Sequence, residues 1–203
     1  FPIEILIYDD ASGDGTQNII EEYQKKYPDI IKPIYQTENQ YSKGVKVGFV
    51  YNYSRAKGEY IAFCEGDDYW IDPLKLQRQV DFLEGNPEYV LTYTGAYIVN
   101  ANSEKQRWRY FLQKRYSGDV TKYLFCKGSF IITATTCYRS DYIAEFTHEK
   151  SMIPFPLKMG DLPLWLFLSL KGKFKYIDEK TTCYRILPQS ASHFKEREKR
   201  IDS

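Results

Sequence analysis

Three carboxylates surround one glycine in the stretch Glu65-Gly66-Asp67-Asp68, directly after the apolar run 60–64. A run of this length and composition is typical of a buried strand. In open α/β sheets, ligands bind beyond the carboxyl ends of the strands. Mg²⁺ and Mn²⁺ prefer oxygen ligands and usually take one or two protein carboxylates together with substrate phosphates. We therefore interpret this stretch as a metal–diphosphate site in which Asp67, Asp68 or both hold the metal ion.

The same four residues also fit an ordinary turn. Glycine permits a positive φ angle, and aspartate stabilises turns through its side chain. Three neighbouring carboxylates repel one another, however, and a structural turn does not need them. The grouping of the carboxylates therefore favours ligand binding over a purely structural role.

Two further blocks place acidic residues at the ends of expected elements. In IEILIYDDASGDGT (residues 3–16), Asp9 and Asp10 end a strand-like run, and in GDLPLWLFLSLKGKFKYIDEKTTCYR (residues 160–185), Asp161 begins an apolar helix. Together with GEYIAFCEGDDYWIDPLKL (residues 58–76), these blocks resemble the motifs of family 2 glycosyltransferases, in the family's order and at about its spacing. The resemblance implies a GT-A fold, which is an α/β, Rossmann-like architecture with a mostly parallel central sheet flanked by helices.

The resemblance also implies an activity and roles for single residues. It implies an inverting transferase that uses a nucleotide-diphosphate sugar, most simply a UDP-sugar, and either Mn²⁺ or Mg²⁺. It assigns one of the aspartates of DDASGDGT to the nucleoside of the donor, for which Asp9 and Asp10 are our candidates, and it assigns Asp161 to deprotonation of the acceptor hydroxyl. Glu65 stands where the family usually has aspartate, and we place it among the donor-binding residues. The expected acceptor is a saccharide or a lipid-linked glycan, and the expected location is the cytoplasm or, through peripheral association, the inner face of the membrane.

Each of these aspartates has a structural alternative. Asp161 fits a plain helix N-cap, a role compatible with catalysis because a cap fixes the carboxylate on a rigid element. Asp9 and Asp10 could also serve a turn, although they lie too early to cap the helix expected after Thr16. For all three, the functional interpretation depends mainly on the resemblance.

Two basic side chains are weaker candidates. Lys43 is available for a phosphate or a carboxylate, and His193 could reach the metal or the diphosphate when a terminal loop closes. The alternatives are a solvated surface lysine and a solvent-facing loop histidine. Segment 100–118 mixes basic and aromatic residues, which fits either an acceptor-side loop or an ordinary exposed excursion.

Periodicity and β-propensity predict the elements that position these residues. The alternation of strands and helices between residues 3 and 63 favours parallel pairing with right-handed crossovers. The helix after Thr16 is expected to bury Ile19, Ile20, Tyr23 and Tyr27, and the helix over 73–83 is expected to bury Leu76, Val80 and Leu83. The expected strands are 3–8, 31–36, 60–64, 89–93, 130–139, 174–177 and 181–185; the remaining expected helices are 122–126, 141–146 and 162–170.

Composition limits the classes of protein that fit. A length of 203 residues suits one domain over residues 1–203, with a nucleotide-sugar half (1–95) and an acceptor half (96–203). A net charge of +1 argues against broad electrostatic binding of nucleic acid. The four cysteines form no C-x-x-C pair, which argues against a zinc site and fits a reducing compartment. No run approaches the roughly 18 apolar residues of a membrane span, and no signal peptide is present.

Two other functions remain compatible with the sequence. A sugar nucleotidyltransferase has a related sheet, but its usual glycine-rich start with Arg and Lys is not visible here. A domain that only binds nucleotide or glycan is the non-enzymatic alternative, against which the carboxylates at both sites argue. Family members normally carry an earlier strand and helix that supply part of the nucleotide pocket, so we expect that part of the pocket to precede Phe1.

Overall fold

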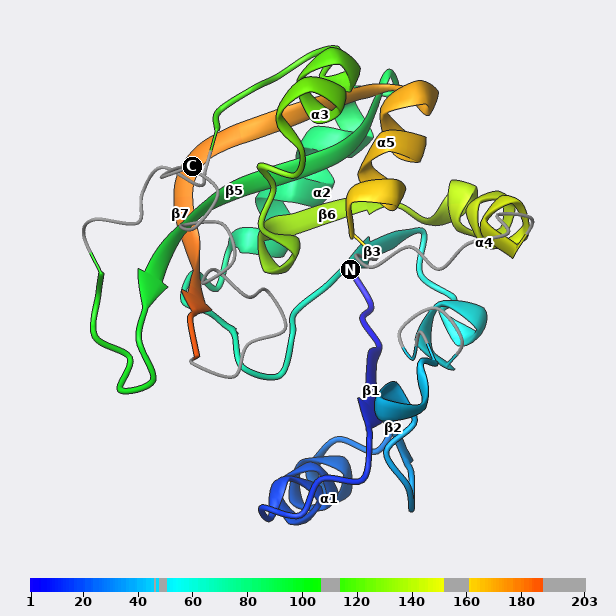
Figure 1. The fold of residues 1–203 in the computed structure, drawn as a ribbon, viewed down its shortest axis with the longest axis vertical. Helices are drawn as coiled ribbons and strands as arrows, with labels where there is room; N and C mark the ends of the chain where they lie inside the picture. The colour runs from blue at the N-terminus through cyan, green and yellow to red at the C-terminus, as the bar shows by residue number, and fades with distance from the viewer. Residues whose placement is uncertain (46, 48–50, 107–113, 152–160, 188–203) are drawn as a thin grey trace, which may run out of the picture. The chain divides into compact units, whose positions relative to one another are not determined.

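The computed structural model describes residues 1–45, 47, 51–106, 114–151 and 161–187. The chain forms two compact units (Figure 1), of which unit 1 comprises 1–61 and 139–164 and unit 2 comprises 62–138 and 165–203. The assignment of residues 1–203 to a single domain stays a prediction. Each unit is described by itself.

Unit 1 begins with a strand–helix–strand motif. Strand β1 (Ile5–Asp9) leads through a turn into helix α1 (Thr16–Lys26), and the chain returns as strand β2 (Ile31–Tyr35). The two strands pair in parallel, from Ile5 opposite Ile31 to Asp9 opposite Tyr35. The parallel pairing predicted from the sequence is thus confirmed for these strands. Arg55 joins them, because its guanidinium donates to the carbonyl oxygens of Ile7 (3.0 Å) and Lys32 (2.7 Å).

The expected buried stripe of α1 is wrong at three of its four positions. Ile20 is buried, whereas Ile19, Tyr23 and Tyr27 are 60%, 48% and 49% exposed. The helix packs on β2, and a sheet of two strands presents a face too narrow to cover a full helical stripe. Periodicity identified the helix correctly but overestimated how much of it is covered.

The remaining elements of unit 1 are short. They are the 3₁₀ turns η1 (Tyr41–Lys43), η3 (Tyr53–Arg55) and η6 (Ser140–Tyr142), helix α4 (Ile143–Ser151), and the first turn of helix α5 (Asp161–Lys171). The last part of α5 belongs to unit 2.

A mixed sheet forms the centre of unit 2. Strands β5 and β7 run parallel, while β6 pairs antiparallel with β5, and β4 pairs antiparallel with β7. Within unit 2 the strand order is β6 (Thr136–Arg139), β5 (Tyr89–Val99), β7 (Lys173–Arg185) and β4 (Tyr69–Trp70). Strand β3 (Tyr60–Ala62) begins in unit 1, which includes residues 1–61.

Several expected strands differ from those observed. The strands expected at 174–177 and 181–185 are one continuous strand, β7, whose register against β5 shifts around Gly95. The shift accommodates the polar residues between the two apolar segments. The strand expected over 130–139 is reduced to β6, because Thr133–Thr135 forms the 3₁₀ turn η5 just before it.

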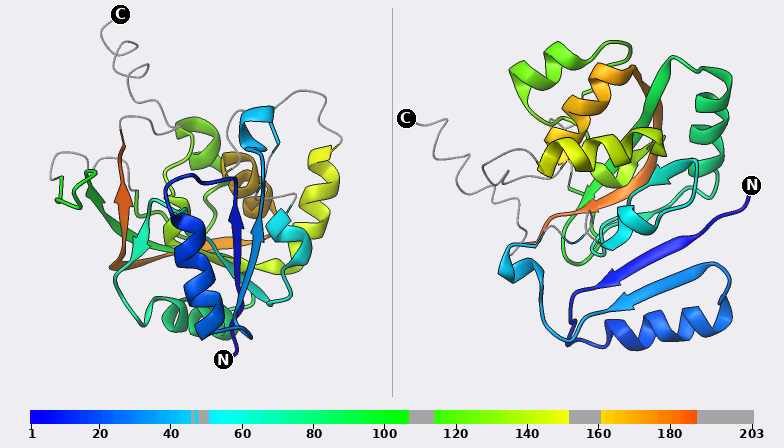
Figure 2. Two further views of the ribbon diagram at one scale, coloured as in Figure 1. Left: turned by 90° about the horizontal axis from the view of Figure 1, so that it is seen from below. Right: turned by 90° about the vertical axis from the view of Figure 1, so that its right-hand side faces the viewer.

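Helices cover both faces of the β5–β7 pair. Helix α2 (Lys75–Gly85) lies on one face, and α3 (Thr121–Lys127) lies with α5 on the other (Figure 2). The hydroxyl of Thr121 donates to the carbonyl oxygen of Ser169, which joins α3 to α5. At the end of α5, a Cβ on Gly172 would lie 2.6 Å from Cγ1 of Val90, so the return into β7 requires glycine.

The buried stripe of α2 differs from the expected one. Its fully buried residues are Lys75, Gln79 and Leu83, while Leu76 and Val80 are only half-buried. The two polar residues satisfy each other, with Lys75 Nζ 2.8 Å from Gln79 Oε1, and Gln79 Nε2 donates to the carbonyl oxygen of Thr135 at 3.0 Å. Burial lowers the pKa of Lys75 to about 8. A count of apolar residues could not reveal this stripe, because its partners are backbone carbonyls distant in the sequence.

Candidate active site

The residues Glu65–Asp68, which we name the acidic loop, form a closed turn between β3 and β4. The backbone N–H of Asp68 donates to the carbonyl oxygen of Glu65 at 3.0 Å. Asp68 is only 8% exposed, and its Oδ1 accepts the backbone N–H of Arg185 at 2.8 Å. The structural turn considered from the sequence is therefore present, and its carboxylates are partly buried within unit 2.

Two carboxylate oxygens of the acidic loop accept no hydrogen bond from any of the described residues. Glu65 Oε2 and Asp68 Oδ2 are both buried without a hydrogen-bond partner. Leaving such a group buried and unpaired is costly, so each one requires an explanation. Buried acceptor oxygens without a donor among the described residues suit a ligand that carries positive charge or donates hydrogen bonds.

The acidic loop also perturbs the titration of its carboxyl groups. Burial, followed by the charge of Asp68, raises the pKa of Glu65 to about 7. Burial likewise raises the pKa of Asp68 to about 7, against the lowering effect of the Arg185 N–H bond. Strongly raised carboxyl pKa values are common where a cation or a substrate completes a site. They also mean that a bound cation must compete with protons near neutral pH.

These residues fit a hard divalent cation that is shared with phosphate oxygens. Across the described ranges, no three His, Cys, Asp or Glu side chains converge to hold a metal ion by themselves. Mg²⁺ and Mn²⁺ do not require such a set when substrate phosphates complete the coordination. Asp68 supplies an unpaired oxygen, and Asp67 lies beside it. His193, the third expected metal ligand, lies outside the described residues.

Asp9 lies at the carboxyl end of β1 in unit 1, as its sequence position predicts. It is 3% exposed, and its Oδ2 accepts the N–H of Ser12 at 3.1 Å and Nε2 of Gln17 at 2.6 Å. Burial acts to raise the pKa of Asp9, but these hydrogen bonds outweigh it and lower the pKa. The side chain is thus a fixed anion that also shapes the turn before α1.

Asp10 organises the loop that follows β2. Its Oδ1 accepts the N–H of Gln40 at 2.7 Å and the hydroxyl of Tyr8 at 3.1 Å, and its Oδ2 accepts the N–H of Tyr41 at 2.9 Å. The ring of Tyr8 stacks on Tyr51 with centroids 4.5 Å apart. The turn role considered from the sequence is therefore observed for both aspartates. Their binding of a nucleoside stays a prediction.

The other two sequence candidates in unit 1 lie on exposed or terminal positions. Lys43 is at the end of η1, where its ammonium pairs with Glu38 on the surface. Asp161 is the first residue of α5 and is half-buried. A carboxylate there interacts favourably with the helix dipole. Unit 1 thus contains Asp9, Asp10, Lys43 and Asp161, and unit 2 contains the acidic loop.

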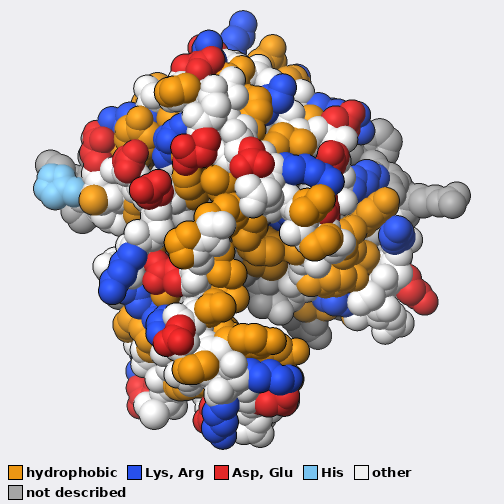
Figure 3. Space-filling model, turned by 180° about the vertical axis from the view of Figure 1, so that it is seen from behind, with side chains coloured by type: hydrophobic (Ala, Val, Ile, Leu, Met, Phe, Trp, Pro, Cys, Tyr) orange, Lys and Arg blue, Asp and Glu red, His pale blue; other side chains and the backbone are white. Residues whose placement is uncertain are grey.

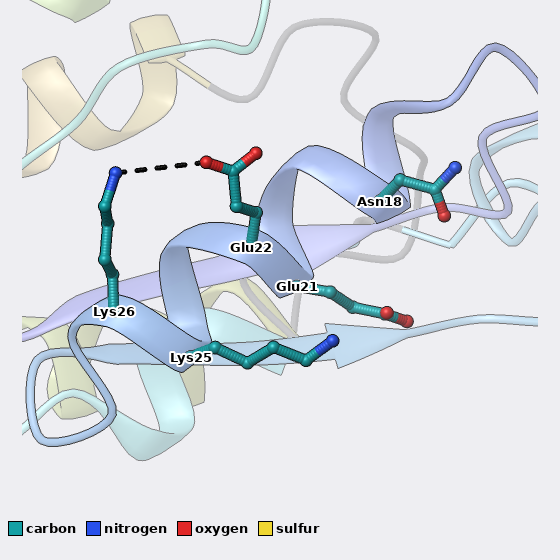
Figure 4. Close-up of a pocket in the computed structure, with 5 residues that line it drawn as sticks. All are labelled: Asn18, Glu21, Glu22, Lys25 and Lys26. Carbon is teal, nitrogen blue, oxygen red and sulfur yellow. Dashed lines mark ion pairs between the residues drawn. The ribbon is translucent and has the colours of Figure 1, made fainter.

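The surface hollow on α1 lies apart from these residues. Asn18, Glu21, Glu22, Lys25 and Lys26 line it, all from one helix (Figure 4). Glu22 and Lys26 form an exposed ion pair at 3.9 Å, one helical turn apart. Charged residues of both signs also alternate over the face seen in Figure 3, in keeping with the net charge of +1. We assign no ligand to this hollow.

Comparison with known proteins identifies the family. The family model described as glycosyl transferase family 2 matches residues 1–147. The chain belongs to glycosyltransferase family 2. Its α/β architecture, with helices on both faces of a curled sheet, is consistent with the GT-A fold expected of family 2.

Curated relatives of this family 2 chain come from several bacteria. An uncharacterized protein of Mycobacterium tuberculosis is 38% identical over 139 residues, 68% of this chain and 39% of that protein. An uncharacterized glycosyltransferase of Nostoc is 29% identical over 190 residues, 91% of this chain and 56% of that protein. A UDP-Glc:alpha-D-GlcNAc-diphosphoundecaprenol beta-1,3-glucosyltransferase of Escherichia coli is 36% identical over 96 residues, 47% of this chain and 35% of that protein. The chain therefore spans less than two-thirds of the length of each of these relatives.

Arg185 contacts the acidic loop, and the sequence did not single it out as a candidate site residue. Its Nε donates to the carbonyl oxygen of Asp67 at 2.9 Å, in addition to the backbone bond to Asp68. From the sequence it was only the last residue of an expected strand. The available signal was a lone arginine ending a strand in a chain with an acidic loop, but β4–β7 pairing was needed to bring the two together.

In the part of the chain that the structure describes, no helix has the length and apolarity to cross a membrane.

Proposed function

We propose that this family 2 chain transfers a sugar from a nucleotide-diphosphate donor, a UDP-sugar, to a saccharide or lipid-linked acceptor. The observation that carries the proposal is the acidic loop, where two buried carboxylate oxygens have no hydrogen-bond partner in the described part of the chain. The printed name of the Escherichia coli relative, which includes UDP-Glc and a diphosphoundecaprenol acceptor, supports these donor and acceptor classes.

Asp68 and Asp67 would hold Mn²⁺ or Mg²⁺, with Glu65 contributing to donor binding. Such a cation, when bound, offsets the negative charge that develops on the leaving diphosphate. The chain's contribution is to hold these carboxylates rigidly, since the turn hydrogen bond and Arg185 fix the acidic loop. In the absence of ligand, Glu65 and Asp68 retain protons up to about pH 7, which limits their mutual repulsion.

Asp161 would act as the general base. It accepts the proton of the acceptor hydroxyl while that oxygen forms a bond to the anomeric carbon of the sugar. The bond from the anomeric carbon to the diphosphate oxygen breaks in the same step, and the nucleoside diphosphate leaves with the electron pair. One displacement inverts the anomeric configuration and requires no enzyme nucleophile. The position of Asp161 at the start of α5 supports this role, because a helix terminus fixes the direction of the carboxylate.

Asp9 and Asp10 would contact the nucleoside through oxygens that can accept further hydrogen bonds from the base or the ribose. Lys43 would pair with the diphosphate in place of Glu38, and His193 would complete the metal ligands. The cysteine pattern supports a reducing compartment, and a lipid-linked acceptor would bring the protein to the inner face of the membrane as a peripheral protein. The synthesis of a surface polysaccharide is the process in which such a transfer fits.

A turnover assay tests the proposal. The protein is incubated with Mn²⁺, a panel of UDP-sugars beginning with UDP-glucose, and a lipid-linked diphospho-N-acetylglucosamine acceptor. We expect acceptor-dependent release of UDP that EDTA abolishes, and a product of inverted anomeric configuration by NMR.

Two outcomes would contradict transfer. Tight UDP binding without release of UDP from any donor would indicate a domain that only binds nucleotide. Release of pyrophosphate from UTP and a sugar phosphate would indicate a nucleotidyltransferase.

A further inference from the structure

Arg185, at the carboxyl end of β7, contacts two separate parts of unit 2. Its backbone N–H binds the carboxylate of Asp68, and its Nε binds the carbonyl oxygen of Asp67. Its Nη1 donates to the carbonyl oxygen of Ala101 at 2.8 Å and to Ser103 Oγ at 3.1 Å. A longer bond of 3.2 Å joins Nη1 to the carbonyl oxygen of Asn100. One side chain thus bridges the acidic loop and the turn that follows β5.

The turn after β5, residues 100–104, is itself well fixed. Asn100 Oδ1 accepts the backbone N–H groups of Asn102 (3.0 Å) and Glu104 (2.9 Å), and the N–H of Asn100 donates to the carbonyl oxygen of Glu104. The backbone N–H of Ile186, the residue after β7, donates to the carbonyl oxygen of Val99 at 2.9 Å. The guanidinium is therefore held by a rigid turn on one side, and it can transmit that rigidity to the acidic loop on the other.

The arrangement depends on the shape of the guanidinium as well as its charge. A guanidinium is planar and has five N–H donors in fixed directions, so its Nε and Nη1 can serve acceptors on different segments. A lysine ammonium is a compact charge on a flexible stem and cannot reproduce this span. The contact between the guanidinium and the ring of Tyr69, at 5.6 Å from the ring centroid, further restricts its plane.

We propose that Arg185 is a positioning residue that fixes the acidic loop to the turn after β5, in the conformation that binds the donor diphosphate. The donor part of this inference rests on the proposed function. The positioning part does not, because the contacts lie within unit 2 and exist without any ligand.

The first test measures the loop itself. Hydrogen–deuterium exchange is compared for wild type, Arg185→Met, Arg185→Lys and the control Arg78→Met, all without ligand. Arg78 belongs to the same unit but pairs with Asp72 and Glu179, neither of which is part of the acidic loop. We expect at least tenfold faster exchange at residues 65–69 in both Arg185 variants and unchanged exchange there in Arg78→Met. Unchanged exchange in Arg185→Met would overturn the positioning role.

The second test measures binding of UDP in the presence of Mn²⁺. We expect Arg185→Met and Arg185→Lys to weaken UDP binding at least tenfold, with Arg78→Met within twofold of wild type. Full rescue by lysine would overturn the geometric account and leave only a charge effect. Ser103→Ala, which removes one guanidinium acceptor without touching the acidic loop, is the milder variant should Arg185→Met fold poorly. The Ser103→Ala substitution should weaken UDP binding severalfold in the wild-type background. It should have no further effect in the Arg185→Met background, because the effects of substitutions at coupled residues are not additive.

The two experiments separate the two proposals. Loss of order in the acidic loop together with no UDP binding by wild type would contradict the proposed function and support the positioning role. UDP binding that is equal in wild type and Arg185→Met would contradict the positioning role alone.

Discussion

Asp161→Asn is expected to reduce sugar transfer at least about 100-fold, because general base catalysis typically contributes 10² to 10⁴ in rate. The amide has nearly the same shape as the carboxylate but cannot take the acceptor proton. Donor binding should survive, with UDP affinity within about twofold of wild type, since in the proposed mechanism the base contacts the acceptor and not the nucleotide. The measurements are turnover of the UDP-sugar and calorimetric titration of UDP on the same preparation.

A matched control is available in the same unit. Asp141 is also an acidic residue in the first turn of a helical segment, and it is exposed. Asp141→Asn should leave both turnover and UDP affinity unchanged. Undiminished turnover in Asp161→Asn would remove Asp161 from the mechanism, and a parallel loss of UDP binding would assign it a structural role instead.

Asp68→Asn is expected to stabilise the ligand-free protein above pH 7. Because burial raises the pKa of Asp68 from 3.8 to about 7, the folded state binds more protons than the unfolded state between these values. The free energy of unfolding therefore falls as pH rises through this window. The loss amounts to on the order of 2 to 4 kcal/mol, since one pKa unit corresponds to about 1.4 kcal/mol and Glu65 shares the same protons. Asparagine carries no charge at any of these pH values, so it avoids this loss.

Urea unfolding between pH 4 and 8 tests this prediction. Wild type should lose stability toward pH 8, and Asp68→Asn should show a shallower loss. Asp81→Asn, on the exposed side of α2, is the control and should follow wild type within about 0.5 kcal/mol. Added Mn²⁺ with UDP should raise the stability of wild type and not that of Asp68→Asn. A variant less stable than wild type at pH 8 would contradict the view that burial of the charged Asp68 carboxylate destabilises the ligand-free protein.

Local sequence signals predicted the elements whose stabilising pattern is local. Helices α1, α3 and α5 and strands β1 and β2 follow from periodicity, β-propensity and the residues that end them. The predictions that failed depend on contacts between residues far apart in the sequence. The exposed face of α1 follows from the width of the sheet on which it packs. The buried Lys75 and Gln79 depend on carbonyl groups of β5 and of the segment 135–136, which no local pattern indicates.

The same distinction between local and non-local signals applies to the candidate site. The positions of Asp9, Asp10 and the acidic loop at strand ends could be read from the sequence, because a strand ends where its apolar run ends. Their partners could not. Asp10 binds Gln40 and Tyr41, about thirty positions away, and the acidic loop binds Arg185, more than one hundred positions away. The pairing of strands brings these distant residues together.

Titration of UDP into the protein, with Mn²⁺ or with EDTA, most directly tests the central claim that the acidic loop binds the donor diphosphate with a divalent cation. Wild type and Asp67→Asn are compared by calorimetry at pH 7.5. The account predicts UDP binding by wild type that requires Mn²⁺ and is lost in Asp67→Asn. Binding that is equally strong in EDTA, or unchanged in Asp67→Asn, would contradict it.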